Sequence, residues 1–313
     1  MNEGNNLVTG GTGFVGRHLV ETLRSYGQRA TILSRCLVNE PYVLCGDLTS
    51  AEFTLGNNEF STVFHLAGLA HTVPRNEKEA SLFFAVNSQG TGNLLRALEK
   101  LDKRPEAFVY VSSVNVYGCD EGEMLDEETP RSARDPYGAS KREAEDKVVE
   151  WGARVGVRSA IVRIPVVVGR GVHGNLKAMV EALRRRRYFG VGSGAARRSM
   201  VLASDVARIL PAIARVGGTY HLTDGYNPSF LELEDAICEA LSRRPPLRVP
   251  RPVANAGAHV GGLLNDALGT SLPLTTSTVN KMTATLTFSD QRARRKLGRR
   301  PEPVLDHVSE LIA

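Results

Sequence analysis

The sequence predicts an α/β protein built on a doubly wound parallel sheet, with a smaller C-terminal lobe. Three observations lead to this prediction. Short apolar strands alternate with amphipathic helices as far as residue 164, a rhythm typical of parallel sheets with helices on both faces. A glycine-rich segment at residues 9–16 joins the first strand to the first helix. After Gly169 the elements become shorter and are separated by Gly, Arg and Pro.

The first half of the chain supplies the sheet. Its strands are short runs of apolar and β-branched residues, of which Ala-Thr-Ile-Leu at residues 30–33 is the clearest. The predicted strands are residues 5–9, 28–34, 41–45, 62–66, 108–111 and 157–164. The helices between them show apolar residues at helical spacing, and Pro136 stands at a helix start, where proline is favoured. The predicted helices are residues 14–26, 77–100 and 136–155.

The second half contains smaller elements. They are helices at residues 176–187, 204–215 and 230–242 and strands at residues 200–202 and 219–222. We therefore expect a sheet domain over residues 1–170 and a lobe made mainly of residues 171–313. A segment near residues 199–225 is expected to return to the sheet domain.

Composition sets limits on the function. The 313 residues are 42% hydrophobic and 23% charged, as in ordinary globular proteins. No apolar stretch is long enough to cross a bilayer, and Met1–Gly4 lacks a signal-peptide pattern. We expect a cytoplasmic protein without a membrane partner. Four dispersed cysteines predict free thiols and no metal site: Cys36, Cys45, Cys119 and Cys238.

The net charge of +5 is locally concentrated. Arg184–Arg187 form an unbroken run, and a second basic cluster lies at residues 292–300. Such runs occur in nucleic-acid-binding proteins, but they also occur on solvated helix faces. No nucleic-acid-binding module accompanies them, so we expect no nucleic-acid partner. The charge would provide a general attraction for anionic ligands.

The glycine-rich segment has the spacing expected of a dinucleotide-binding turn. Gly10 permits a tight turn, Gly13 lets the backbone approach a pyrophosphate, and Gly16 lets the helix pack closely. Phosphates would rest on the N–H groups at the start of the following helix. Residues 1–170 are therefore predicted to be a Rossmann-type dinucleotide-binding domain, and the C-terminal lobe to bind substrate. The cofactor contacts predicted in the glycine-rich segment include Thr12, Phe14 and Val15.

The end of the second strand bears on the choice between NAD and NADP. Proteins that bind NAD often carry an acid there to hold the ribose 2′-hydroxyl, whereas this chain has Ser34 and Arg35. A guanidinium matches a 2′-phosphate, so NADPH is favoured and NAD stays possible. Asp47 is placed to accept from the adenine amino group. Further predicted cofactor contacts at strand ends are Leu48, Leu66, Ala67 and Gly68.

Tyr137 and Lys141 are separated by four residues, which places them on one face of the helix at residues 136–155. A phenol ionises near about pH 10, and a neighbouring ammonium lowers that pKa. Tyr137 could then exchange a proton with a sugar hydroxyl while a hydride moves to or from nicotinamide. Ser113, at the end of the fifth strand, could donate to a developing oxyanion. These three residues form the predicted catalytic constellation.

The chain resembles the extended short-chain dehydrogenase/reductase family, in its nucleotide-sugar epimerase/dehydratase branch. The motifs that carry the resemblance run from about residue 7 to residue 225: TGGTGFVG (9–16), GDL (46–48), FHLAG (64–68), VNSQGTGNLL (86–95), VSSVNVYG (111–118), DPYGASK (135–141) and RIPVVVGRGVHGN (163–175). It implies the catalytic roles of Ser113, Tyr137 and Lys141 given above. It also implies cofactor contacts from Asn87, Val111, Ser112, Ile164 and Val166. Substrate contacts are implied for Ser113, Asn115, Asn175 and Arg198. The resemblance further implies a homodimer, formed by the helices at residues 77–100 and 136–155.

One departure from the family pattern narrows the reaction. Members that remove water from the sugar carry an acidic pair after the catalytic hydroxyl, where this chain has Val114 and Asn115. Neither can act as a general acid or base. We therefore expect an oxidoreductase acting at carbon 4 of a nucleoside-diphosphate hexose, with a 4-ketoreductase slightly favoured over a UDP-sugar 4-epimerase. A 4,6-dehydratase, a reductase of non-sugar ketones and an inactive binding protein are disfavoured.

Two histidines lie near the predicted site. His65 ends a buried strand and is expected to be packed or hydrogen-bonded there. His71 follows on the next loop and is a candidate substrate contact.

Overall fold

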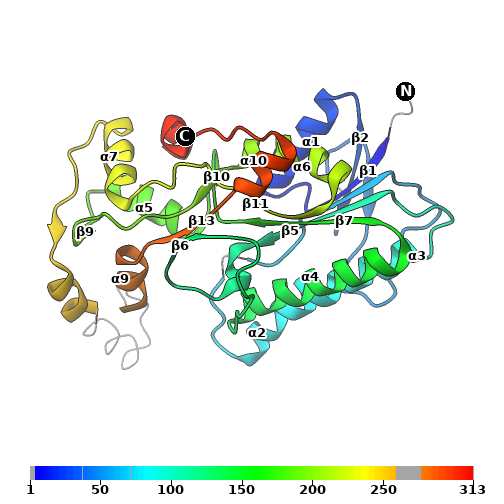
Figure 1. Cartoon of the computed structure of the whole chain (residues 1–313), viewed down its shortest axis with the longest axis horizontal. Coiled ribbons are helices and arrows are strands. Elements are labelled where there is room, and N and C mark those ends of the chain that lie inside the picture. The colour runs from blue at the N-terminus through cyan, green and yellow to red at the C-terminus, as the bar shows by residue number, and fades with distance from the viewer. Residues whose placement is uncertain (1–3, 37, 71, 259–275, 313) are drawn as a thin grey trace.

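The computed structural model describes residues 4–36, 38–70, 72–258 and 276–312. Its centre is a seven-stranded sheet in which every neighbouring pair is parallel (Figure 1). Its strands are β1 (Asn5–Thr9), β2 (Arg29–Ser34), β3 (Val43–Cys45), β4 (Thr62–His65), β5 (Ala107–Ser113), β7 (Arg158–Ile164) and β11 (Gly218–His221). They lie in the order β11-β7-β5-β4-β1-β2-β3. The predicted doubly wound parallel sheet is confirmed.

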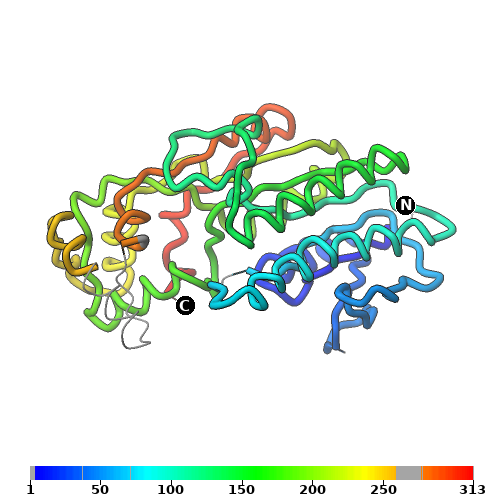
Figure 2. Tube along the Cα trace, turned by 90° about the horizontal axis from the view of Figure 1, so that it is seen from below, coloured from blue at the N-terminus to red at the C-terminus, as the bar shows by residue number. Residues whose placement is uncertain are grey.

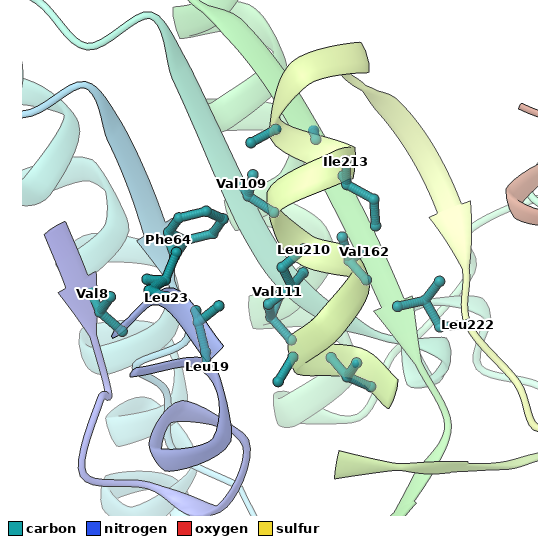
Figure 3. Packing of buried hydrophobic residues seen from close by; sticks show 14 of the residues in the cluster. Val8, Leu19, Leu23, Phe64, Val109, Val111, Val162, Leu210, Ile213 and Leu222 are labelled. Carbon is teal, nitrogen blue, oxygen red and sulfur yellow. The ribbon is translucent and has the colours of Figure 1, made fainter. Parts of the chain in front are cut away.

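Helices lie above and below this sheet in Figure 1, and Figure 2 looks onto the lower of the two helical layers. On one face, α1 (Phe14–Ser25) and α6 (Ala203–Val216) pack on the strands through Leu19, Leu23, Leu210 and Ile213 (Figure 3). On the other face, α3 (Gly90–Glu99) and α4 (Pro136–Val155) bury a second cluster that contains Trp151. Burial of such side chains contributes about 1.5–3 kcal/mol each. The two clusters together hold the strand ends in fixed positions.

The helix expected at residues 77–100 is interrupted, so that expectation was wrong. The chain forms α2 (Glu77–Phe83), a π-helical turn (Phe84–Gln89) and then α3. The hydroxyl of Thr91, in α3, donates to the Asn87 carbonyl of the turn at 2.5 Å, and the Asn87 side chain bonds to a neighbouring loop. Single π-helical turns of this kind occur frequently at functional sites.

The C-terminal lobe is built from short pieces. The strands of the lobe form three pairs, two of which include a strand from before residue 171: β10 (Met200–Leu202) with β8 (Val166–Val168), β12 (Arg248–Val249) with β9 (Gly190–Val191), and β13 (Leu286–Phe288) with β6 (Gly122–Leu125). Its helices include α5 (Gly174–Arg184), α7 (Phe230–Ala240), α9 (Thr276–Thr283), α10 (Gln291–Leu297) and α11 (Val308–Ile312). Of these strands only β10 was predicted, because two to four residues carry too little periodicity to identify a strand.

The order of the strands reverses beside β1. The chain runs outward from β1 to β2 and β3, then returns to place β4 on the other side of β1. In open parallel sheets, ligands bind at such a reversal, beside the carboxyl ends of the strands. Gly10, Leu66 and Ser113 lie at or just beyond these ends. Within the part of the chain that the structure describes, no helix is long and apolar enough to cross a membrane.

Candidate active site

The glycine turn is shaped so that side chains would not fit in it. Gly10 has φ +68°, a conformation that favours glycine. A Cβ on Gly16 would lie 2.0 Å from the carbonyl oxygen of Gly10, so α1 can approach the turn only with glycine there. Gly13 is the N-cap of α1 and, among the described residues, no side chain caps this helix end. The N–H groups of its first turn are therefore available to an anion.

The residues expected at the adenosine end lie after β2 and β3. Arg35 is exposed, and the Ser34 hydroxyl accepts a long bond from the Cys36 N–H at 3.4 Å. Asp47 accepts from the backbone N–H and hydroxyl of Thr49 at 2.9 and 2.8 Å, and these bonds lower the pKa of its carboxyl. Asp47 thus already stabilises a local turn. Its proposed contact with adenine stays a prediction.

The loop after β4 is pinned to the π-helical turn by Asn87. Its side chain accepts from the Leu69 N–H at 2.7 Å and donates to the Leu69 carbonyl at 3.1 Å and to the Ser140 hydroxyl at 3.0 Å. A Cβ on Gly68 would lie 3.0 Å from Asn87 Oδ1 and 3.2 Å from Lys141 Nζ. Glycine at residue 68 therefore lets this loop lie directly against the lysine. The sequence did not reveal the bonds from Asn87 to Leu69 and Ser140.

Tyr137 and Ser113 meet between α4 and the end of β5. Tyr137 lies in the first turn of α4, whose N-cap Asp135 accepts from the Gly138 N–H. Burial raises the pKa of the Tyr137 phenol, and a hydrogen bond from Ser113 opposes that rise. The direction is opposite to the one expected from the sequence. The phenol therefore holds its proton at neutral pH and is poised to donate it.

Lys141 lies one turn further along α4 and is buried. Its ammonium donates to the Val111 carbonyl at 3.0 Å and lies 4.7 Å from the centre of the Tyr110 ring. Burial lowers the pKa of Lys141 to about 8, and the negative charge of Glu145 opposes that fall. The ammonium thus binds a carbonyl near the end of β5.

A buried polar network that the sequence analysis missed continues from α4. Glu145 pairs with Arg163 of β7 through bonds of 2.8 to 3.2 Å, and both side chains are almost fully buried. Arg163 also donates to the Tyr117 hydroxyl at 2.7 Å, which in turn donates to His221 Nε2. His221 Nδ1 donates to the Ser289 carbonyl at 3.1 Å, which fixes this order of donors. The spacing of Tyr137, Lys141 and Glu145 at four-residue intervals was the available signal.

His65 is a structural residue, as expected. It is buried at the end of β4, with Nδ1 2.6 Å from the Thr9 hydroxyl and Nε2 2.9 Å from the Thr91 hydroxyl. Burial lowers its pKa to about 3, and the charge of Lys141 adds to this effect. Burial likewise lowers the pKa of His221 to about 4. Both imidazoles are therefore neutral across the physiological range.

These two histidines predict a loss of stability in acid. Their folded pKa values lie below the unfolded value of about 6.5, so between about pH 6.5 and 4 the unfolded chain binds more protons than the folded chain. The free energy of unfolding should therefore fall by several kcal/mol, on the order of 3 per histidine, as the pH falls through this range. Urea unfolding at a series of pH values measures it. His65→Gln should flatten the slope, whereas the partly exposed His18→Gln should keep it. A constant unfolding free energy between pH 6.5 and 4.5 would contradict the prediction.

The residues expected to contact substrate are less closely grouped. Asn115 is exposed, and its backbone N–H donates to Ser113 Oγ at 3.2 Å. Asn175 is exposed in the first turn of α5. Arg198 is partly buried and donates to the Lys281 carbonyl at 2.6 Å. His71 lies outside the described residues.

The remaining cofactor candidates lie at strand ends. Ile164 ends β7, and Val166 begins β8 with 44% of its surface exposed. Ser112 is buried beside Ser113, and its hydroxyl has no hydrogen-bond partner among the described residues. The same residues contain no cluster of side chains suited to a metal ion. The site therefore offers a glycine turn, a buried lysine and a protonated phenol at one edge of the sheet.

Comparison with known proteins agrees with this arrangement. Residues 6–222 match the model of the NAD dependent epimerase/dehydratase family. A UDP-glucose 4-epimerase from Vibrio cholerae is 28% identical over 96% of this chain and 91% of its own length. Two solved structures have the same fold: the human epimerase family protein SDR39U1 with NADPH (TM-score 0.75, 22% identity, 98% of each chain covered) and MoeE5 in complex with UDP-glucose and NAD (TM-score 0.74, 24% identity, 99% and 97% covered).

Proposed function

Because this chain belongs to the NAD dependent epimerase/dehydratase family, we propose that it moves a hydride at carbon 4 of a nucleoside-diphosphate sugar. The observation that carries the proposal is that Ser113 bonds to Tyr137, while Lys141 binds the end of β5 and lies against Gly68. The similarity to a UDP-glucose 4-epimerase over nearly the whole chain supports a sugar substrate. It also supports 4-epimerisation as the first candidate reaction.

The residues at the sheet edge fit a nicotinamide dinucleotide. A pyrophosphate would rest at the turn formed by Gly10–Gly16, against the N–H groups of α1 that no side chain of the described residues caps. Further along the edge, Gly68, Asn87 and Lys141 would hold the nicotinamide ribose. A bound nicotinamide would accept a hydride from the sugar and return it. The cofactor candidates named from the sequence are proposed to make these contacts.

The protein's own residues would manage the proton. Tyr137 Oη exchanges a proton with the oxygen on carbon 4, and Ser113 Oγ donates to that oxygen while it carries negative charge. Lys141 holds the end of β5 through Val111 and so fixes the separation of these two hydroxyls. For the diphosphate, we propose Arg198 and Asn175, because a guanidinium and an amide supply hydrogen-bond donors.

A 4-ketoreductase is the second candidate. The exposed Arg35 just after β2 favours it, because a guanidinium there suits NADPH, the cofactor that reductive enzymes commonly use. The Tyr137 phenol also favours it, because it holds its proton at neutral pH. The two reactions differ in cofactor consumption. With UDP-glucose and substoichiometric NAD, an epimerase forms UDP-galactose without net change in reduced nicotinamide. A reductase consumes one NADPH for each UDP-4-keto sugar. Absence of both reactions with UDP-, GDP- and dTDP-sugars would contradict the proposed function.

Arg35 is expected to determine the choice of cofactor. Arg35→Ser removes a charged donor from the proposed 2′-phosphate contact, so the Kd for NADPH should rise about 10- to 100-fold. The Kd for NADH should change less than about 3-fold, because NADH lacks this phosphate. Fluorescence titration of both cofactors measures the difference. The exposed Arg215→Ser should leave both values unchanged, and an equal loss for the two cofactors in Arg35→Ser would refute the assignment.

A homodimer is proposed through α3 and α4. These helices lie along one face of the molecule (Figure 1), and Val149 of α4 is 50% exposed there. Leu82 of α2 is 48% exposed. Light scattering should give twice the mass of the chain. Val149→Glu should shift the equilibrium toward monomers, because the dimer would have to bury an unpaired charge in its interface. A monomeric mass for the unmodified protein at all accessible concentrations would rule the dimer out.

A further inference from the structure

One end of the C-terminal lobe carries a dense positive charge. We call residues 181–191 and 239–253 the basic tip. It contains eight arginines and two glutamates, with no lysine or aspartate. The arginines are Arg184, Arg185, Arg186, Arg187, Arg243, Arg244, Arg248 and Arg251. In Figure 1, α5, α7 and β9 lie together at the left end of the molecule, and the other view agrees (Figure 2).

The fold brings the two parts of the basic tip together. Helices α5 and α7 pack through a shared core, and each ends with the same capping bond. The Arg187 N–H donates to the Ala182 carbonyl, and the Arg243 N–H donates to the Cys238 carbonyl, both at 2.8 Å. Beyond the caps, β9 and β12 run parallel, with Gly190 opposite Arg248. Both arginine runs therefore leave the fold at the same end.

Pairing within the protein uses only part of this charge. Arg184 and Arg185 share Glu181, and Arg248 pairs with the buried Glu234. The other exposed arginines of the tip make no ion pair with the residues that the structure describes: Arg186, Arg187, Arg243, Arg244 and Arg251. Against them stand the exposed Glu239 and two helix C-termini of about half a negative charge each. These add up to about two negative charges, which do not balance five arginines.

The basic tip also carries three exposed apolar side chains. Phe189 is 57% exposed, Leu247 77% and Val253 59%. Phe189 and Leu247 are neighbours, because the Gly190 N–H donates to the Leu247 carbonyl at 2.9 Å across the start of the β9–β12 pair. Exposed apolar side chains surrounded by arginines are the arrangement that interfacial surfaces use. The apolar groups enter the boundary of the acyl chains while the cations remain at the phosphates.

We propose that the basic tip binds the surface of an anionic lipid bilayer. Phe189, Leu247 and Val253 would enter the head-group layer, and the unpaired arginines would contact lipid phosphates. Nucleic acid is the less suitable occupant, because single-strand binding uses several stacking rings and duplex reading uses an element that fits a groove. The proposal does not depend on the proposed activity. It revises the expectation of no membrane partner without requiring a spanning helix.

Sedimentation with lipid vesicles tests the proposal on the full chain. The protein should bind phosphatidylcholine vesicles that contain phosphatidylglycerol but not pure phosphatidylcholine vesicles, and added salt should weaken the binding. The triple variant Arg187→Gln/Arg243→Gln/Arg244→Gln should reduce the partition coefficient roughly 100-fold, given the contribution of each arginine near an anionic surface. Phe189→Ser/Leu247→Ser should also weaken binding. The binding that remains should be lost at a lower concentration of added salt than the binding of the unmodified protein.

The matched control removes the same charge elsewhere. Lys100, Lys103 and Arg104 are exposed at the end of α3, at the opposite end of the molecule (Figure 1). Lys100→Gln/Lys103→Gln/Arg104→Gln should bind vesicles like the unmodified protein. Equal losses in the two triple variants, or no binding to anionic vesicles, would overturn the proposal. So would displacement from vesicles by a DNA duplex at equal phosphate concentration, since this would make nucleic acid the preferred partner. Circular dichroism of each variant verifies that it is folded.

Discussion

Tyr137→Phe should lower kcat by about 10²- to 10⁴-fold, the range typical of a lost proton-transfer group. The substitution removes one oxygen and keeps the ring, which packs edge to face on Phe83 at the end of α2 with the ring centres 6.0 Å apart. Folding and cofactor affinity should therefore change little. Steady-state kinetics with the substrate found by the cofactor-consumption assay, together with cofactor titration, separate these effects.

The control for this variant is Tyr26→Phe. Tyr26 follows α1 and is 57% exposed, remote from Ser113 and Lys141. It should have normal kinetics. If Tyr137→Phe retained more than about a tenth of the activity, the phenol would not be the proton donor. A fall in thermal stability that paralleled the fall in kcat would instead indicate a packing role.

Gly16→Ala should destabilise the protein by at least about 3 kcal/mol, at the upper end of the usual cost of overpacking. The new Cβ would lie 2.0 Å from the Gly10 carbonyl oxygen, 2.8 Å from the Gly10 carbonyl carbon and 2.8 Å from the Gly11 Cα. All three atoms belong to the backbone, so relief requires α1 to move away from the turn. Cofactor binding should be lost together with stability, because the same movement displaces the N–H groups of the first helical turn.

Gly92→Ala is the matched control. Gly92 lies within α3, and a Cβ there would meet only side-chain atoms, at 3.8 and 3.9 Å. Alanine is the better helix former by up to about 1 kcal/mol, so this variant should be as stable as the unmodified protein or more stable. Urea unfolding compares the two. A Gly16→Ala protein with normal stability and normal cofactor affinity would show that the turn is more adaptable than its contacts indicate.

The sheet and helix α4 could be predicted from the sequence because their signals are strong and local. The strand-glycine-helix order around Gly10–Gly16 and the proline start of α4 each specify an element without reference to distant residues. The π-helical turn could not be predicted, since it depends on Asn87 meeting Leu69 and Ser140, which lie 18 and 53 residues away. The small strands of the lobe were missed for a related reason, as their pairing partners are remote.

The sequence predicted which residues form the candidate site, but it did not predict the directions of their pKa shifts. Four-residue spacing placed Tyr137 and Lys141 together, yet burial dominates both of their pKa values. Burial depends on the packing of β5, α4 and the loop at Gly68, which sequence spacing does not report. The Glu145–Arg163 pair shows the same limit, because its members come from α4 and β7 and meet only in the folded protein.

The position of β11 has a consequence for how the chain is made. This edge strand pairs with β7, with Gly218 opposite Ala160, although β8, α5, β9, β10 and α6 lie between them in sequence. Helix α6, which covers one face of the sheet, also comes late. A nascent chain that has left the ribosome only as far as α5 would expose Val109, Val111 and Val162 to water (Figure 3). Synthesis of the next few dozen residues is therefore the interval in which chaperones would be most needed.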